Sequence, residues 1–246
     1  MSTLTYAPWR WLIAIPGLLL AILVAGIACL ALLLFLPPRR VNTLIPLWWA
    51  RVSLWLIPAR VKVTGREHLE PNQSYIVVAN HLSHVDIYVL YGKLGMDLRW
   101  VMKQELRRVP VIGVCSAGLG HIFVNRENRQ EALDALRDAK TRLAADGASI
   151  MFFPEGTRSR DGRLQGFKKG AFMMAKDMNL PLLPVTLRGT DAILPPHTLA
   201  VLPGQVEVVI HRPISAEQVR GRTGDDLMAE SRALIASALP ADRVAQ

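Results

Sequence analysis

Two histidines and an aspartate stand within seven residues in the segment NHLSHVD, which covers residues 80–86. His81 and Asp86 are five positions apart, so in one unbroken helix their side chains would point about 140° away from each other. They can meet only if a strand ends near Asn80 and a helix starts near His84. An aspartate that binds one ring nitrogen of a histidine leaves the other nitrogen free to act as a base. This segment therefore predicts a His81/Asp86 dyad.

The nucleophile that such a dyad would activate stays open. Ser83 could form an acyl-enzyme as in a serine hydrolase, although the residues around it do not match the G-x-S-x-G pattern of one large hydrolase class. Alternatively, His81 could activate a hydroxyl group of the substrate, since a histidine pKa of about 6.5 suits base catalysis at neutral pH. Two interpretations without a dyad also remain: a metal site formed by His81, His84 and Asp86, and a simple polar turn.

Positive charge gathers in segments that could bind an anion. The segment FPEGTRS at 153–159 places Glu155 and Arg158 around a glycine. Arg158 offers a two-pronged donor for a phosphate, and Glu155 could hold that arginine or a substrate hydroxyl in place. Arg126, at the end of GHIFVNR, and Lys103, in VMKQEL, could add charge to the same site. A Walker A phosphate loop is absent from the sequence.

These polar clusters follow short apolar runs that are typical of buried strands. The runs alternate with segments of helical pattern, which favours an α/β fold with a mostly parallel sheet flanked by helices. In such sheets ligands bind beyond the carboxyl ends of the strands, which is where these clusters stand. The predicted strands are VKVTG (61–65), SYIVVAN (74–80), RWVMK (99–103), HIFVN (121–125), SIMFFP (149–154), PLLPVTL (181–187) and VEVVIH (206–211).

The clearest helix is predicted between residues 128 and 147. Asn128 and Glu131 form a capping box at its start, and Gly147 closes it. Further helices are expected after Asp86, within residues 168–179 and from about residue 224 to 238. The apolar stripe of the clearest helix consists of Ala132, Leu136, Ala139 and Leu143.

The first forty residues differ from the rest in composition. No charged residue occurs from Trp11 to Leu36, and as a helix this stretch would be about 39 Å long, more than the hydrocarbon core of a bilayer at about 30 Å. It is also longer than the apolar region of a signal peptide, which has about 7 to 15 residues. A second apolar stretch, 44–58, contains Arg51 and the tryptophans 48, 49 and 55, which suit the membrane interface. The two stretches could form a hairpin in one leaflet, or one span followed by an interfacial helix.

We therefore expect a membrane-embedded helical segment in residues 1–58 and an α/β domain in residues 59–246. The net charge is +9, from 29 Lys and Arg against 20 Asp and Glu, and beside an anchor this charge indicates anionic lipid and not nucleic acid as the partner. If the first segment spans the membrane, Arg10 lies on one side and the arginines at 39, 40, 51 and 60 on the other, which places the C-terminal domain in the cytoplasm. Cys29 and Cys115 provide no disulfide framework and no CxxC metal pattern.

Four segments together resemble a known family. NHLSHVD, GHIFVNR, FPEGTRS and LPLLPVTL occur in the order and approximate spacing of the four blocks of the glycerolipid acyltransferases, and the resemblance covers roughly residues 60–215. It implies transfer of an acyl group from acyl-CoA or acyl carrier protein to the free sn-2 hydroxyl of 1-acylglycerol-3-phosphate, which gives phosphatidic acid at the inner membrane. It implies no metal and no other cofactor.

The resemblance also implies roles for particular residues. His81 would be the general base at the acceptor hydroxyl and Asp86 its orienting partner, without an acyl-enzyme. Other acceptors stay open, such as a lyso-ornithine lipid, another lysophospholipid or glycerol-3-phosphate, and so does a membrane lipid-binding protein that has lost catalysis. The residues that the resemblance places around the acceptor's glycerol phosphate are Glu155, Gly156, Thr157 and Arg158, with Arg126 and, as a further candidate, Lys103.

Overall fold

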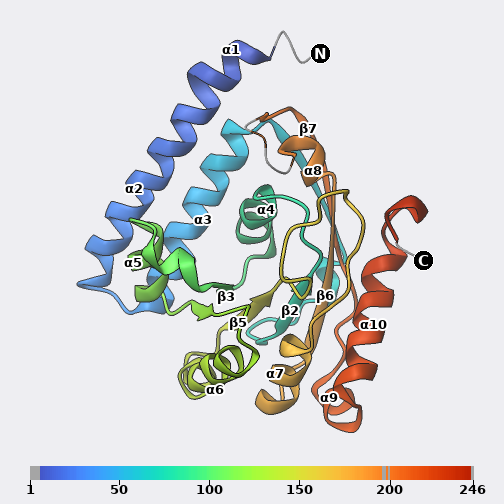
Figure 1. The fold of residues 1–246 in the computed structure, drawn as a ribbon. Helices are drawn as coiled ribbons and strands as arrows, with labels where there is room; N and C mark the ends of the chain where they lie inside the picture. Colours follow the sequence, from blue (N-terminus) through green and yellow to red (C-terminus); the bar gives the residue numbers. More distant parts are fainter. Residues whose placement is uncertain (1–5, 196–197, 199, 245–246) are drawn as a thin grey trace.

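A seven-stranded sheet flanked by helices forms the centre of the structure, a computed structural model that describes residues 6–195, 198 and 200–244 (Figure 1). The strand order is β1-β7-β6-β2-β5-β3-β4, and within the described residues every neighbouring pair is parallel except β6 and β7. The predicted, mostly parallel sheet is confirmed. Its strands, each overlapping a predicted segment, are β1 (Ala59–Thr64), β2 (Ile76–Ala79), β3 (Leu98–Lys103), β4 (Ile122–Val124), β5 (Ser149–Phe152), β6 (Leu182–Arg188) and β7 (Gly204–Ile210).

The helices include every one that the sequence predicted. The predicted helices of the α/β domain correspond to α4, α6, α7 and α10, whereas the short helices α5, α8 and α9 were not predicted. A run such as IGVCSAG in α5 is too short and too rich in small residues to show a helical period. The helices are α1 (Ala7–Trp9), α2 (Ile15–Leu33), α3 (Pro38–Leu56), α4 (Val85–Leu94), α5 (Ile112–Gly118), α6 (Arg129–Asp146), α7 (Gly170–Met178), α8 (Thr190–Ile193), α9 (Ala216–Gly221) and α10 (Gly224–Ser237).

Helix α6 begins and ends where its cap residues predict. The Asn128 side chain accepts hydrogen bonds from the backbone N–H groups of Gln130 and Glu131, and Gly147 ends the helix in the left-handed conformation with φ of 62°. The reciprocal arm of the predicted capping box differs, because the Glu131 carboxylate binds the Asn128 side-chain amide at 2.6 Å and not its backbone. The start of the helix is nevertheless satisfied, as a capped N-terminus requires.

The two faces of the sheet pack against different helices, as the alternation of side chains along a strand requires. Val77 and Ala79 of β2 belong to a core shared with α3 and α4. Ile76 and Val78 belong to a second core shared with α6, α7 and α10. In Figure 1, α3 and α4 accordingly cover one face and α6, α7 and α10 the other. The carboxyl end of β2 therefore lies between two packed layers.

An N-terminal helical hairpin of α2 and α3 lies beside the sheet domain (Figure 1). Among the described residues, one helical stretch, Ala7–Leu33, is long and apolar enough to cross a membrane. Much of its apolar surface is exposed, with Leu34 and Phe35 after it the most open. These observations support membrane association. Trp48 and Trp55 are exposed, and their interfacial role stays a prediction. Trp49 packs edge-on against Tyr88 at a centroid distance of 4.9 Å.

The expected boundary at residues 58 and 59 falls between the end of α3 and the start of β1. Packing nevertheless crosses this boundary, because Ala50, Leu54 and Ile57 belong to the same apolar core as the sheet. The hairpin is thus joined to the sheet domain through buried side chains.

Candidate active site

His81 and Asp86 meet at the carboxyl end of β2, where the chain turns into α4. The turn runs through residues 80–84, and His84 precedes the first helical residue. The His81 Nδ1 atom lies 2.7 Å from Asp86 Oδ2. A carboxylate oxygen only accepts hydrogen bonds, so Nδ1 carries a hydrogen, and in the neutral ring Nε2 then has the lone pair. The structure therefore brings the predicted pair together in the tautomer that a base requires.

The Asp86 carboxylate is fully buried and held from several sides. Its Oδ2 atom also accepts hydrogen bonds from the backbone N–H groups of Leu82 and Ser83, at 2.7 and 2.9 Å. Its Oδ1 atom accepts one from the hydroxyl of Thr190 at 2.5 Å. Buried charge without partners is costly, and these donors replace the lost water. The carboxylate is thereby fixed in one orientation toward His81.

The FPEGTRS segment at residues 153–159 holds the backbone and the ring of His81. The backbone N–H of His81 donates to Glu155 Oε1 at 2.7 Å, and its carbonyl accepts from the Ser159 N–H at 2.8 Å. The imidazole stacks on the Phe153 ring, with centroids 3.8 Å apart and planes at 6°. His81 is thus fixed at its backbone, at Nδ1 and across one ring face.

The structure corrects the expectation that Glu155 faces the substrate or an arginine. Its second carboxylate oxygen accepts from the Gln165 N–H at 3.1 Å, so both oxygens bind backbone groups. Burial raises the pKa of Glu155 to about 7, against an ordinary value of 4.5. Glu155 therefore connects two loops beneath the site and does not line the cavity in front of it.

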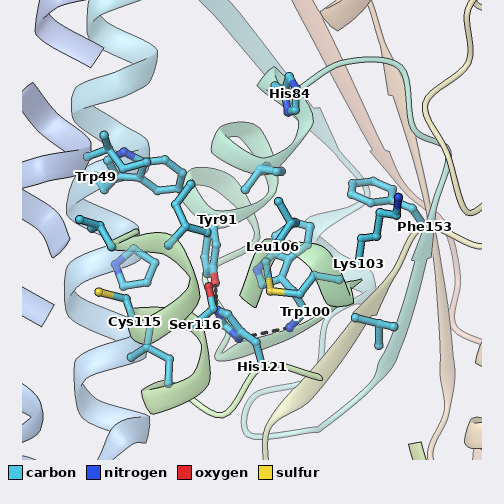
Figure 2. Close-up of a pocket in the computed structure, with 18 of the residues that line it drawn as sticks. Trp49, His84, Tyr91, Trp100, Lys103, Leu106, Cys115, Ser116, His121 and Phe153 are labelled. Atoms are coloured by element: carbon cyan, nitrogen blue, oxygen red, sulfur yellow. Dashed lines mark hydrogen bonds between the residues drawn. The ribbon is translucent and has the colours of Figure 1, made fainter. Parts of the chain in front are cut away.

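A cavity of about 600 Å³ opens in front of the dyad (Figure 2). Its volume falls in the range of sites for small molecules. In Figure 2, His84 lies at the top and Lys103 and Phe153 lie at the right, whereas Cys115 lies at the left and His121 at the bottom. The predicted site residues that line the cavity are His81, Lys103, Arg126, Thr157 and Arg158, whereas Asp86, Glu155 and Gly156 lie behind its surface.

Cationic side chains surround the dyad end of this cavity. Arg126 donates a hydrogen bond to the carbonyl of Gly156, which has a left-handed backbone with φ of 79°. Lys103 pairs with the exposed Glu105 at 2.8 Å. Burial lowers the pKa of His84, and the positive charge of the nearby Arg158 lowers it further. The predicted cations thus line the same cavity as His81, and the Gly156 carbonyl holds one of them.

The rest of the cavity wall is mostly apolar and comes from both parts of the chain. The Tyr91 hydroxyl lies 3.1 Å from His121 Nε2, and the Trp100 backbone N–H donates to His121 Nδ1 at 3.4 Å. Burial lowers the pKa of His121 to about 3, so this histidine is neutral. Sequence reasoning did not single out His121 or Tyr91. The apolar residues contributed by α2, α3 and α5 are Ile22, Ala25, Gly26, Cys29, Ile45, Pro46, Trp49, Ile112 and Cys115.

Two alternative interpretations of the NHLSHVD segment receive no support from the geometry. Ser83 is fully buried, and its hydroxyl donates to the Leu194 carbonyl at 2.8 Å while it accepts from the Val85 N–H. It does not reach the cavity as a nucleophile must. Across the part of the chain that the structure describes, no group of three or more His, Cys, Asp or Glu side chains is arranged to hold a metal ion.

Together the fold and the site define a membrane-associated α/β protein with a His/Asp dyad at the cationic end of an apolar cavity. The family model described as Acyltransferase matches residues 60–188. The chain belongs to this acyltransferase family.

Several known proteins are similar to this chain over most of its length. A 1-acyl-sn-glycerol-3-phosphate acyltransferase of Chlamydomonas reinhardtii is 37% identical over 187 residues, which are 75% of this chain and 54% of the relative. A chloroplastic 1-acyl-sn-glycerol-3-phosphate acyltransferase of Arabidopsis thaliana is 37% identical over 210 residues, 84% of this chain and 57% of the relative. The chain thus spans a little over half the length of these curated relatives.

A solved structure shares nearly the whole fold. The crystal structure of a 1-acyl-sn-glycerophosphate acyltransferase from Thermotoga maritima matches with a TM-score of 0.77 and 25% identity. The match covers 96% of this chain and 94% of that one, so it includes the helical hairpin as well as the sheet domain.

Proposed function

We propose that this protein transfers an acyl group from an acyl thioester to the free sn-2 hydroxyl of 1-acylglycerol-3-phosphate, giving phosphatidic acid. The observation that carries this proposal is the 2.7 Å His81–Asp86 contact at the cationic end of a largely apolar cavity. A lysophosphatidate has the matching form, with a phosphate and a hydroxyl at one end and a hydrocarbon chain at the other. The relatives of this protein are named as acyltransferases for this acceptor, which supports the same acceptor here.

In the proposed reaction, His81 Nε2 removes the proton of the acceptor hydroxyl as that oxygen attacks the thioester carbonyl. The imidazolium that forms is stabilised by the buried Asp86 carboxylate. The tetrahedral intermediate then collapses, the C–S bond breaks, and the leaving thiolate takes the proton from His81. No acyl-enzyme is needed, which agrees with the position of Ser83 behind the cavity surface.

Arg126, Arg158 and Thr157 are proposed to hold the acceptor's phosphate. All three line the cavity together with His81, and guanidinium groups bind phosphate oxygens through paired, charge-assisted hydrogen bonds. Lys103 is the further cation there. No metal or other cofactor takes part in this proposal. The donor is acyl-CoA or acyl carrier protein, because both carry the acyl group as the thioester that the acceptor hydroxyl attacks.

We further propose that the sheet domain faces the cytoplasm at the inner membrane. This orientation rests on the excess of arginine after the first apolar segment, at residues 39, 40, 51 and 60, over the single Arg10 before it. Both proposed donors are cytoplasmic molecules, which agrees with this side.

The proposal is tested with detergent-solubilised wild-type protein and the His81→Ala variant side by side. Each receives lysophosphatidate with a long-chain acyl-CoA or acyl carrier protein, and released thiol and phosphatidate are both quantified. We expect equal amounts of the two products from the wild type and turnover lower by about 10² to 10⁴-fold in the variant. Thiol without phosphatidate would indicate a thioesterase. A parallel reaction contains a lysolipid without phosphate, and product only in that reaction would indicate a different acceptor.

A further inference from the structure

The segment 187–194, which contains the end of β6 and helix α8, packs against the back of the NHLSHVD turn. The Asn80 side chain donates to the Leu187 carbonyl at 2.9 Å and accepts from its N–H at 2.8 Å. The Ser83 hydroxyl donates to the Leu194 carbonyl at 2.8 Å. Asn80 and Ser83 are both buried. Polar residues of the turn that do not face the cavity therefore bind this one segment, at both of its ends.

The middle of the same segment reaches the dyad itself. The Thr190 hydroxyl donates to Asp86 Oδ1 at 2.5 Å, and both side chains are fully buried. The remaining donors, at His81, Leu82 and Ser83, all bind the other oxygen, Oδ2. Among the described residues, Thr190 is thus the partner of Oδ1. Water has no access to replace it, so this hydroxyl opposes rotation of the carboxylate out of line with the imidazole.

We propose that Thr190 is a positioning residue for the His81–Asp86 pair, acting through the carboxylate and not on the substrate. The inference rests on the proposed function for its kinetic part, because it assumes that His81 is the base. Thr190 lies just beyond residues 60–188, which the family model matches. It stabilises the one orientation of Asp86 in which Oδ2 stays 2.7 Å from His81 Nδ1.

A purely structural threonine would also be buried and hydrogen-bonded, so the experiment needs a matched control. Thr186, on the neighbouring β6, is fully buried and its hydroxyl donates to the Ile235 carbonyl at 3.0 Å and lies 2.8 Å from His211 Nε2. It contacts neither dyad residue. Replacing Thr186 by valine removes a buried hydroxyl of the same kind without touching the pair.

The test compares Thr190→Val, Thr190→Ser and Thr186→Val with the wild type in the phosphatidate assay. For Thr190→Val we expect kcat to fall at least tenfold, with the KM values of both substrates within about twofold. A tenfold loss corresponds to about 1.4 kcal/mol of transition-state stabilisation. Thr190→Ser should keep kcat within about threefold, because its hydroxyl restores the contact. Thr186→Val should lower the melting temperature but not kcat.

A second measurement separates this inference from the proposed function. The hydrogen on His81 Nδ1 gives a low-field proton resonance in NMR, whose position reports its hydrogen bond to Asp86. We expect this resonance to shift or broaden in Thr190→Val and to stay unchanged in Thr186→Val. If the wild type makes no phosphatidate, the proposed function fails and the resonance alone decides the role of Thr190. Equal kcat in the two valine variants, or an unchanged resonance in Thr190→Val, would overturn the inference.

Discussion

The contact between Asp86 and His81 gives a quantitative prediction for the Asp86→Asn variant. Asparagine has the same shape, and its carbonyl oxygen can keep the place of Oδ2, where three N–H donors converge. Its amide nitrogen then faces the Thr190 hydroxyl, which can turn to accept a hydrogen bond. The variant should therefore fold and keep the His81 tautomer while it loses the negative charge.

The magnitude follows from the charge that disappears. In the proposed reaction His81 becomes an imidazolium whose ring nitrogen lies 2.7 Å from the carboxylate oxygen, so the two charge centres are about 4 Å apart. At an effective dielectric constant of about 20, the attraction between them is about 4 kcal/mol. Its loss corresponds to about 10³-fold in kcat. The KM for lysophosphatidate should change little, because Asp86 does not line the cavity.

The assay is phosphatidate formation at saturating donor and acceptor, measured for the wild type, Asp86→Asn, His81→Ala and the double variant. If Asp86 acts through His81, then Asp86→Asn should have almost no further effect in the His81→Ala background, since residues that act as a unit are not additive. A melting curve for each variant checks the fold. A kcat within tenfold of the wild type, or a full additional loss in the double variant, would refute this account of Asp86.

Two further predictions concern the residues around the dyad. Arg158→Ala should raise the KM for lysophosphatidate about 10 to 100-fold, because a charge-assisted hydrogen bond contributes about 1.5–3 kcal/mol. Turnover of a monoacylglycerol, which has no phosphate, should not change. Equal effects on both acceptors would remove Arg158 from the phosphate site. Glu155 should make the stability of the fold depend on pH, because its pKa is raised to about 7 from 4.5. The folded state binds the proton more tightly than the unfolded state does. About 3 kcal/mol of stability that is present below pH 4.5 is therefore lost as the pH rises through 7. The Glu155→Gln variant should not lose this stability as the pH rises. Parallel plots of melting temperature against pH for the wild type and the variant would contradict the role of the buried Glu155 carboxyl.

The dyad could be predicted from sequence because its geometry is local. His81 and Asp86 are separated by five residues, and a strand end followed by a helix start leaves few ways to arrange them. The strands could also be predicted, since strands buried on both faces appear as short apolar runs. Thr190 could not be predicted, because it contacts Asp86 across a separation of 104 residues, which depends on how β6 and β2 pair in the sheet.

The direction of the Glu155 side chain could not be predicted for a similar reason. A carboxylate next to an arginine suggests an ion pair, but backbone N–H groups of two other loops use both of its oxygens in the folded chain. The cavity wall was also beyond sequence analysis. Apolar residues of α2 such as Ile22 and Ala25 are equally suited to contact lipid, and only tertiary packing against α5 turns them toward the site.

The cavity in front of His81 depends on the N-terminal helical hairpin, because the hairpin forms part of its wall. Helices α2 and α3 supply Ile22, Ala25 and Trp49 to the cavity wall. The cavity is therefore complete only when the helical hairpin is packed against the sheet domain. A chain whose hairpin is displaced from the sheet domain would therefore have His81 at an open surface and not in an enclosed space.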